Sequence, residues 1–170
     1  MFIFQVAQEI LLQEVNIEKV KEDAEEFYRN GTFFCSEAIV ASIRKNLAPQ
    51  MPEELIAAAS GFPVGVGRSR CMCGAISGAV ICLGYLFGRT QAGDGSRSEK
   101  CLKLANELQE SFRKNHKGVL CCSVHTKGMD MASGEHKEQC ISFTGEMAAK
   151  TAEIAARELN IPVTGHGDTK

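Results

Sequence analysis

The charge-free stretch 74–86 constrains the fold of this chain more than any other feature. Its residues are small or apolar, and the next charged residue is Arg89. Such a run predicts a helix that is buried on most sides, so other elements must surround it. The preceding stretch 61–67 is rich in glycine and indicates a loop. Cys73 then lies at or near the first turn of the helix, where free backbone N–H groups and the helix dipole favour a thiolate.

The other apolar residues also recur at helical spacing. Predicted helices cover residues 2–15, 17–28, 32–49, 52–61, 74–86, 98–117 and 138–159. Asn16 is the predicted cap of the second helix, and either Ser96 or Ser98 caps the sixth. No segment shows a sustained alternation of β-branched or aromatic residues with polar ones. We therefore expect an all-α fold, a single-domain helical bundle of about five to seven helices.

The totals of the chain exclude several classes of partner. The chain has 170 residues, a net charge of -2 and a pI near 6.1, which gives no electrostatic reason to bind nucleic acid or an anionic membrane. The apolar N-terminus is interrupted by Gln5, Gln8 and Glu9 and does not resemble a signal peptide. No run approaches the roughly 20 apolar residues that span a bilayer. We expect a cytoplasmic protein without nucleic acid or membrane partners.

The chain contains eight cysteines. Because the cytosol keeps structural thiols reduced, metal binding or redox chemistry explains them better than a disulfide framework. Cys82 lies roughly half a revolution around the predicted helix from Cys73, so we expect it to pack in the core. Cys101 shares a helix face with apolar residues and is also expected in the core. Cys71 lies in the loop, where it could be a resolving thiol or simply be exposed.

The motif Cys73-Gly-Ala-Ile-Ser-Gly78 follows Gly65-Val-Gly-Arg68, and separate cysteines lie upstream and downstream of it. This pattern resembles the C_GCAxxG_C_C family of redox-active proteins, over about residues 23–159. Members of that family share four cysteines and a CGAxxG motif. The resemblance implies a functional set that consists of Cys35, Cys73, Cys122 and Cys140.

One member of this set has a competitor. Cys121 and Cys122 are adjacent, and either could be the third cysteine of the family pattern. Cys122 is preferred because Lys127-Gly128 follows it at the distance that the pattern suggests. Cys35 matches within Phe-Cys-Ser-Glu-Ala, and Cys140 matches within Gln-Cys-Ile.

The family is also similar to the non-haem part of split-Soret cytochromes, in which such cysteines hold an iron–sulfur centre. The chain has no Cys-x-x-Cys-His motif, so attached haem is not implied. The resemblance implies a helical domain whose four thiols converge on an iron–sulfur cluster, with [2Fe–2S] favoured, and an electron-transfer role with a redox partner protein. We expect residues 1–22 to be an N-terminal helical extension, 23–160 the four-cysteine redox domain and 161–170 a flexible tail.

Two alternatives to a cluster stay open. In a metal-free thiol–disulfide protein, Cys73 would be the low-pKa catalytic nucleophile. Its resolving partner could be Cys71, Cys35 or Cys122. In a zinc-binding module, the four cysteines of the family pattern would hold the metal, and His125 could replace one thiolate. Whether the protein is an oxidoreductase or an electron carrier is also left open by the sequence.

Glycines and arginines beside the motif have structural explanations. Gly74 and Gly78 are four residues apart and form a smooth stripe on which another helix can pack closely. The loop 61–67 lacks the Gly-Lys-Ser/Thr of a phosphate-binding P-loop. Arg68 or Arg70 is therefore better suited to offset the negative charge of a thiolate site.

Two further expectations concern surfaces. The amphipathic segment 1–15 is expected to cover a hydrophobic surface or a second subunit, and it is the reason to consider a homodimer. No arrangement of serine, histidine and carboxylate residues supports hydrolytic catalysis. The histidines other than His125 are expected at the protein surface: His116, His136 and His166.

Overall fold

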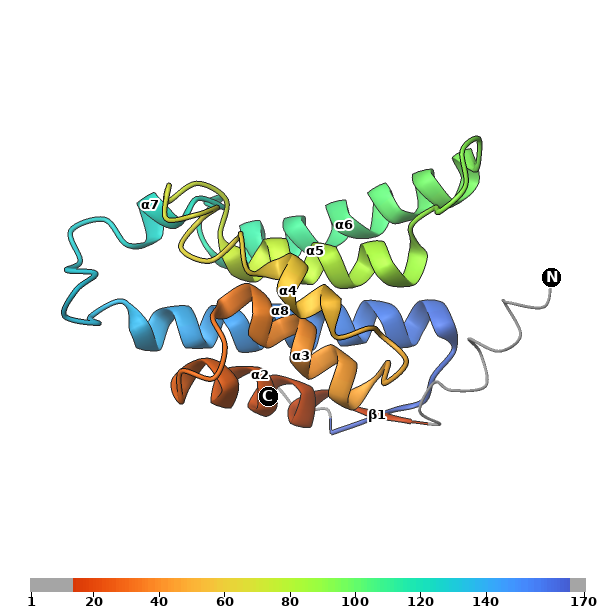
Figure 1. The fold of residues 1–170 in the computed structure, drawn as a ribbon, viewed down its shortest axis with the longest axis horizontal. Coiled ribbons are helices and arrows are strands. Elements are labelled where there is room, and N and C mark those ends of the chain that lie inside the picture. The colour runs from red at the N-terminus through yellow and green to blue at the C-terminus, as the bar shows by residue number, and fades with distance from the viewer. Residues whose placement is uncertain (1–13, 166–170) are drawn as a thin grey trace.

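The computed structural model describes residues 14–165, and Figure 1 shows its fold. This part of the chain forms seven helices and two very short strands, and the predicted all-α bundle is confirmed. The helices are α2 (Ile17–Arg29), α3 (Cys35–Asn46), α4 (Glu54–Ala59), α5 (Gly74–Phe87), α6 (Gly95–Asn115), α7 (Cys122–His125) and α8 (Lys137–Leu159). No helix of residues 14–165 is long and apolar enough to cross a membrane.

Six of the predicted helices are present in the structure, with ends that differ by a few residues. Residues 2–13 of the first predicted helix and residues 166–170 of the predicted C-terminal tail lie outside the described residues. The suggestion of a homodimer depends on that first segment and stays a prediction. The single-turn helix α7 lies within a stretch that was predicted to be mostly loop.

Helix α8 lies at the centre of the bundle and packs against α2, α3, α5 and α6. In the view of Figure 1, α2 lies below α8, while α5 and α6 lie above it. Four buried alanines of α8 have small side chains, so neighbouring helices approach it closely on several sides. They are Ala148, Ala152, Ala155 and Ala156.

The two short strands, β1 (Val15–Asn16) and β2 (Val163–Thr164), were not predicted from the sequence. They pair in parallel, with Val15 opposite Val163. The backbone N–H of Val15 also donates to the Pro162 carbonyl at 2.9 Å. Each strand has two residues, too few to show an alternating pattern. Their pairing joins the start of α2 to the chain that leaves α8.

The helix caps agree with the sequence at one position and differ at another. The Asn16 side chain accepts a hydrogen bond from the Lys19 N–H at 2.9 Å, so the predicted cap of α2 is confirmed. Helix α6 is capped by Asp94, whose carboxylate accepts from the Arg97 N–H at 3.1 Å. The predicted caps Ser96 and Ser98 were wrong, because a capping carboxylate was available earlier in the chain.

The glycine stripe of α5 packs against α3, as the sequence indicated. A Cβ atom at Gly78 would lie 2.5 Å from the Ser36 carbonyl oxygen and 2.7 Å from its Cα. A Cβ atom at Gly74 would lie 2.5 Å from the Cys35 sulfur. Since real Cβ atoms do not approach other atoms so closely, only glycine allows α3 and α5 to lie this near each other.

We expect Gly78→Ala to lower the free energy of unfolding by about 1–3 kcal/mol, because the added methyl group meets rigid α3 backbone. Gly84→Ala in the same helix is the matched control, since a Cβ there meets no heavy atom within 4 Å. The control should be neutral or stabilising by up to about 1 kcal/mol through helix propensity. Chemical denaturation measures both effects. Equal stability of the two variants would contradict the close α3–α5 contact.

Candidate redox site at four helix N-termini

Four cysteines from separate parts of the chain line one small cavity: Cys35, Cys73, Cys122 and Cys140. Each lies at or near the N-terminus of a helix. Cys35 and Cys122 are the first residues of α3 and α7, and Cys73 is the residue before α5. Cys140 lies in the first turn of α8. The structure therefore brings together the four residues that the family resemblance implied, and it places Cys122 at a helix start rather than in a loop.

The cavity between the thiols is narrow and largely closed to solvent. Its open space is about 20 Å³, which is room for roughly one water molecule. Three of its cysteines are at most 9% exposed, and Cys140 is partly buried. The remaining walls come from a helix, two loops and the start of α8, and include Tyr28, Val64, Met131 and His136.

Backbone pairing holds two of the cysteine segments side by side. Met72 and Cys121 form an isolated antiparallel bridge. On either side of it, the Cys73 N–H donates to Leu120 at 3.0 Å and the Cys122 N–H donates to the Cys71 carbonyl at 2.7 Å. This short ladder fixes the start of α5 beside the start of α7, so the Cys73 and Cys122 thiols reach the same cavity.

A left-handed loop supports the site on the Cys35 side. Residues 64–68 all have positive φ angles, between 54° and 69°, and three of these residues are not glycine. This conformation costs roughly 1–2 kcal/mol for each non-glycine residue. Internal hydrogen bonds hold it, among them Val66 N–H to Phe62 at 3.0 Å and Arg70 N–H to Val64 at 3.0 Å. The loop directs the Val64 N–H at the Cys35 sulfur.

Burial decides the protonation state of the thiols. It raises the pKa of Cys73 to about 11, although the N–H groups of Ala75 and Ile76 donate to the sulfur and lower the pKa. The sequence predicted a thiolate-favouring position for Cys73, and that expectation was wrong for the metal-free protein. The N–H donors at the helix start are present, but the loss of solvation outweighs them.

The other three thiols follow the same rule. Burial and the neighbouring Cys73 raise the pKa of Cys35 to about 12. Burial also raises the pKa of Cys140 to about 12, while a hydrogen bond from the Tyr28 hydroxyl opposes this shift. The pKa of Cys122 is raised by burial, and the Thr126 hydroxyl and the Arg70 guanidinium oppose it. Arg70, one of the two arginines expected to offset the negative charge of a thiolate site, therefore acts on Cys122.

The structure keeps the remaining cysteines away from the cavity. Cys71 and Cys121 are exposed and do not line it, which separates Cys121 from its neighbour Cys122. Cys82 is fully buried in the hydrophobic core, as helix phase indicated. Cys101 is partly buried and packs against that core.

The histidines differ more from expectation. His125 does not line the cysteine cavity; its Nε2 lies 3.2 Å from the Val119 carbonyl oxygen and its ring packs on Phe143. His116 was expected at the surface but is partly buried, with its Nε2 2.6 Å from a Glu146 oxygen. His136 was also expected at the surface, yet it lines the cavity, and its buried Nδ1 has no hydrogen-bond partner among residues 14–165.

Sequence reasoning therefore missed two residues of the site. Helical spacing places Tyr28 on the inner side of the second predicted helix but does not indicate its partner, and in the structure its hydroxyl donates to Cys140. His136 lies four residues before Cys140, and this spacing would have placed both on one side of a continuous helix. That signal was available in the sequence.

The side chains of the cavity are of the types that bind zinc or iron–sulfur clusters, but their spacing in the structure is not that of a metal site. Four thiols with N–H and O–H donors to sulfur are the ligands that zinc and iron–sulfur clusters use. Within residues 14–165, no group of three or more histidine, cysteine or acidic side chains has the spacing that holds a metal ion. Metal or cluster binding therefore requires the thiol side chains to shift within the cavity.

Alkylation of the metal-free protein tests these burial and pKa assignments. With pKa values of about 11 to 12, the buried thiols Cys35, Cys73 and Cys140 hold only about one thiolate in 10⁴ to 10⁵ at pH 7. Iodoacetamide should label the exposed Cys71 and Cys121 first, as peptide mass spectrometry would show. Modification of Cys73 before Cys71 would contradict the assignment and favour a low-pKa nucleophile.

Comparisons with known proteins agree with this site. A family model described as "Putative redox-active protein (C_GCAxxG_C_C)" matches residues 33–154. The matched range contains all four cavity cysteines and the motif that begins at Cys73. No curated protein and no solved structure gives a significant match. Because the family model covers more than half of the 170 residues, the chain belongs to the C_GCAxxG_C_C family of redox-active proteins.

Proposed function

We propose that this protein is an electron-transfer protein whose four cavity cysteines bind an iron–sulfur cluster, with [2Fe–2S] favoured. The observation that carries the proposal is the convergence of four distant thiols, each at or near a helix N-terminus, on one closed cavity. A cluster bound there would supply one-electron redox chemistry. Cys35, Cys73, Cys122 and Cys140 would be its ligands, and a separate protein would be its redox partner.

The surroundings of the four thiols favour binding of a metal cation over the presence of free thiolates. Burial raises the pKa of all four sulfurs, so each keeps its proton in the metal-free protein. Iron or zinc displaces such protons, because the metal charge compensates the thiolates in place of water. The cavity thus provides sulfur ligands that are shielded from oxidants until metal arrives.

Residues around the cavity have defined tasks in this proposal. The N–H groups of Val64, Ala75 and Ile76 donate to thiol sulfurs and would stabilise them as thiolates. The Tyr28 hydroxyl does the same for Cys140, and Arg70 places a positive charge near Cys122. Donors of this kind raise the reduction potential of a cluster.

The same convergence would serve a thiol–disulfide protein, which is the second candidate. Cys73 is close enough to Cys35 for its charge to raise the pKa of the Cys35 thiol, and the Cys35 sulfur lies against Gly74. Oxidation of two such thiols by a disulfide partner forms one S–S bond in this protein and breaks the S–S bond of the partner, and the two electrons and two protons of the thiols pass to the partner, which becomes two thiols. The raised pKa values make this reaction slow, so we rank this candidate second.

Replacement of single cysteines tests the cluster proposal. Cys35→Ser, Cys73→Ser, Cys122→Ser and Cys140→Ser should each lower bound iron and acid-labile sulfide about tenfold or more after anaerobic reconstitution. Cys121→Ser is the matched control, because it is adjacent to Cys122 but exposed and outside the cavity. It should retain full iron, sulfide and visible absorption.

The outcomes separate the candidates. Colourless wild-type protein with neither iron nor sulfide after reconstitution would rule out the cluster. Zinc bound with similar affinity, lost together with the fold on chelation, would favour the zinc module. A reversible Cys35–Cys73 disulfide in a redox titration, without metal, would favour the second candidate.

Tyr28→Phe removes one donor without changing the shape of the cavity. The hydrogen bond from Tyr28 would stabilise the reduced cluster more than the oxidised cluster, because the reduced sulfur carries more negative charge. We therefore expect the reduction potential of the reconstituted variant to become more negative. Tyr85→Phe is the control, since Tyr85 is 38% exposed, lies outside the cysteine cavity and donates its hydroxyl to the Gln50 carbonyl at 3.4 Å. Equal reduction potentials for the two variants would show that the Tyr28 hydroxyl does not act on the cluster.

A further inference from the structure

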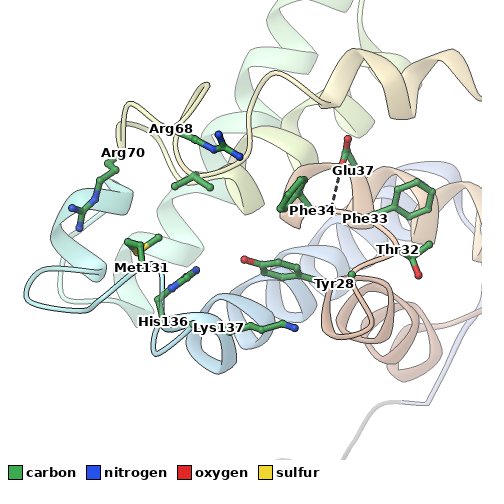
Figure 2. Close-up of a pocket in the computed structure, with 13 residues that line it drawn as sticks. Tyr28, Thr32, Phe33, Phe34, Glu37, Arg68, Arg70, Met131, His136 and Lys137 are labelled. Atoms are coloured by element: carbon green, nitrogen blue, oxygen red, sulfur yellow. Dashed lines mark hydrogen bonds between the residues drawn. The ribbon is translucent and has the colours of Figure 1, made fainter.

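A second and larger cavity opens next to the cysteine cavity. Its volume is about 820 Å³, which is in the range of small-molecule binding sites. The two cavities share part of their walls: Tyr28, Val64, Met131 and His136 line both. Figure 2 shows this larger pocket between the start of α3, the loop that follows α4 and the start of α8. A molecule bound in it would lie one side-chain layer from the thiols.

The charged residues that line the pocket are mostly basic. Arg68, Arg70 and Lys137 contribute positive charges to its walls, and Glu37 is its one acidic lining residue within the described part of the chain. Glu37 is already engaged: its carboxylate accepts from the Phe34 N–H at 2.8 Å and from the Ser60 hydroxyl at 2.5 Å. The pocket therefore presents more positive than negative charge and attracts anions.

Two buried polar atoms of this pocket have no hydrogen-bond partner within residues 14–165: the Arg70 Nε and the His136 Nδ1. The other end of the Arg70 guanidinium donates to the Thr126 carbonyl at 3.0 Å and to the Thr126 hydroxyl at 2.7 Å, which holds Arg70 in place. Arg68 is exposed, and its side chain forms no hydrogen bond or ion pair with the described residues. Buried polar atoms are normally paired, so unpaired ones that border a cavity indicate a missing ligand group.

Aromatic side chains form the other part of the pocket. Phe34 is 52% exposed, which is unusual for a phenyl ring, and Phe33 and Tyr28 also line the pocket. In the view of Figure 2, Phe34 and Tyr28 lie next to each other, with Arg68 on one side and His136 on the other. An exposed aromatic ring, two partly buried ones and nearby cationic side chains suit a ligand with a flat ring and an anionic group.

We propose that this pocket binds a small anionic molecule with a planar ring, such as a phosphorylated flavin or a sulfonated quinone. Its anionic group contacts Arg68, with His136 and Arg70 close by, and its ring packs on Phe34 and Tyr28. Binding itself is independent of the cluster, whereas the role of the ligand as an electron donor or acceptor rests on the proposed function. The shared wall places the ring beside the thiol cavity.

Two probes with the required chemistry test the proposal on the full chain: flavin mononucleotide and anthraquinone-2-sulfonate. We expect saturable binding of at least one, measured by calorimetry and by quenching of flavin fluorescence. Riboflavin, which lacks the phosphate, should bind about tenfold or more weaker than flavin mononucleotide, because charge-assisted hydrogen bonds to the anion are lost.

Matched variants assign the contacts. Arg68→Gln should weaken binding of the anionic probe about tenfold and leave riboflavin unchanged. Arg89→Gln is its control, because Arg89 is exposed and lies outside the pocket lining. Phe34→Leu should weaken both ring probes, whereas Tyr85→Leu, outside the pocket, should not. Circular dichroism of each variant verifies that it is folded.

Absence of saturable binding of both anionic probes to the wild-type chain would overturn the proposal. Binding that neither Arg68→Gln nor Phe34→Leu alters would overturn it as well, since the ligand would then lie elsewhere. The titrations use both metal-free and reconstituted protein. Protein that takes up iron but binds no probe would overturn the proposed ligand pocket and leave the cluster proposal standing. Protein that binds a probe but takes up no iron would overturn the cluster proposal and support the ligand pocket.

Discussion

The contact between α3 and α5 determines where the cysteines of this protein meet. Gly78 lies directly against the backbone of Ser36, and Gly74 leaves space that the Cys35 sulfur occupies. Because neither glycine has a side chain, the N-terminus of α5 comes up to the N-terminus of α3. Cys73 and Cys35 thereby border one cavity, and the pairing of Met72 with Cys121 brings Cys122 to it. The glycines of the motif, Gly74 and Gly78, thus position its cysteine, Cys73, beside the other thiols.

Two opposing effects act on the sulfurs once they meet. Helix starts supply N–H donors that favour a thiolate, and burial removes the water that would stabilise it. Burial prevails, so the thiols are neutral in the metal-free protein. The left-handed loop 64–68 links this inner site to the outer pocket, since Val64 donates to Cys35 and Arg68 lines the pocket. Backbone strain of this kind is typical of segments with a functional task.

Much of the fold could be predicted from the sequence, because helix formation depends on local spacing. The apolar period located the helices, Asn16 identified the start of α2, and helix phase placed Cys82 in the core. The strand pair and the Asp94 cap could not be predicted in this way. A strand of two residues is too short to show an alternating pattern. Asp94, Ser96 and Ser98 could each cap the same helix, and the sequence does not show at which of them the helix begins.

The sequence by itself determined the helical bundle, the family motif and the four cysteines that belong to it. Only the tertiary structure showed that Cys121 is exposed while Cys122 lines the cavity, set the pKa direction of the thiols and opened a basic pocket beside them. The physical reason is that burial depends on which distant segments pack together. A periodic pattern shows which residues lie on the buried face of a helix. The residues that pack against that face decide how well each side chain is solvated, whether it is charged and what it bonds to.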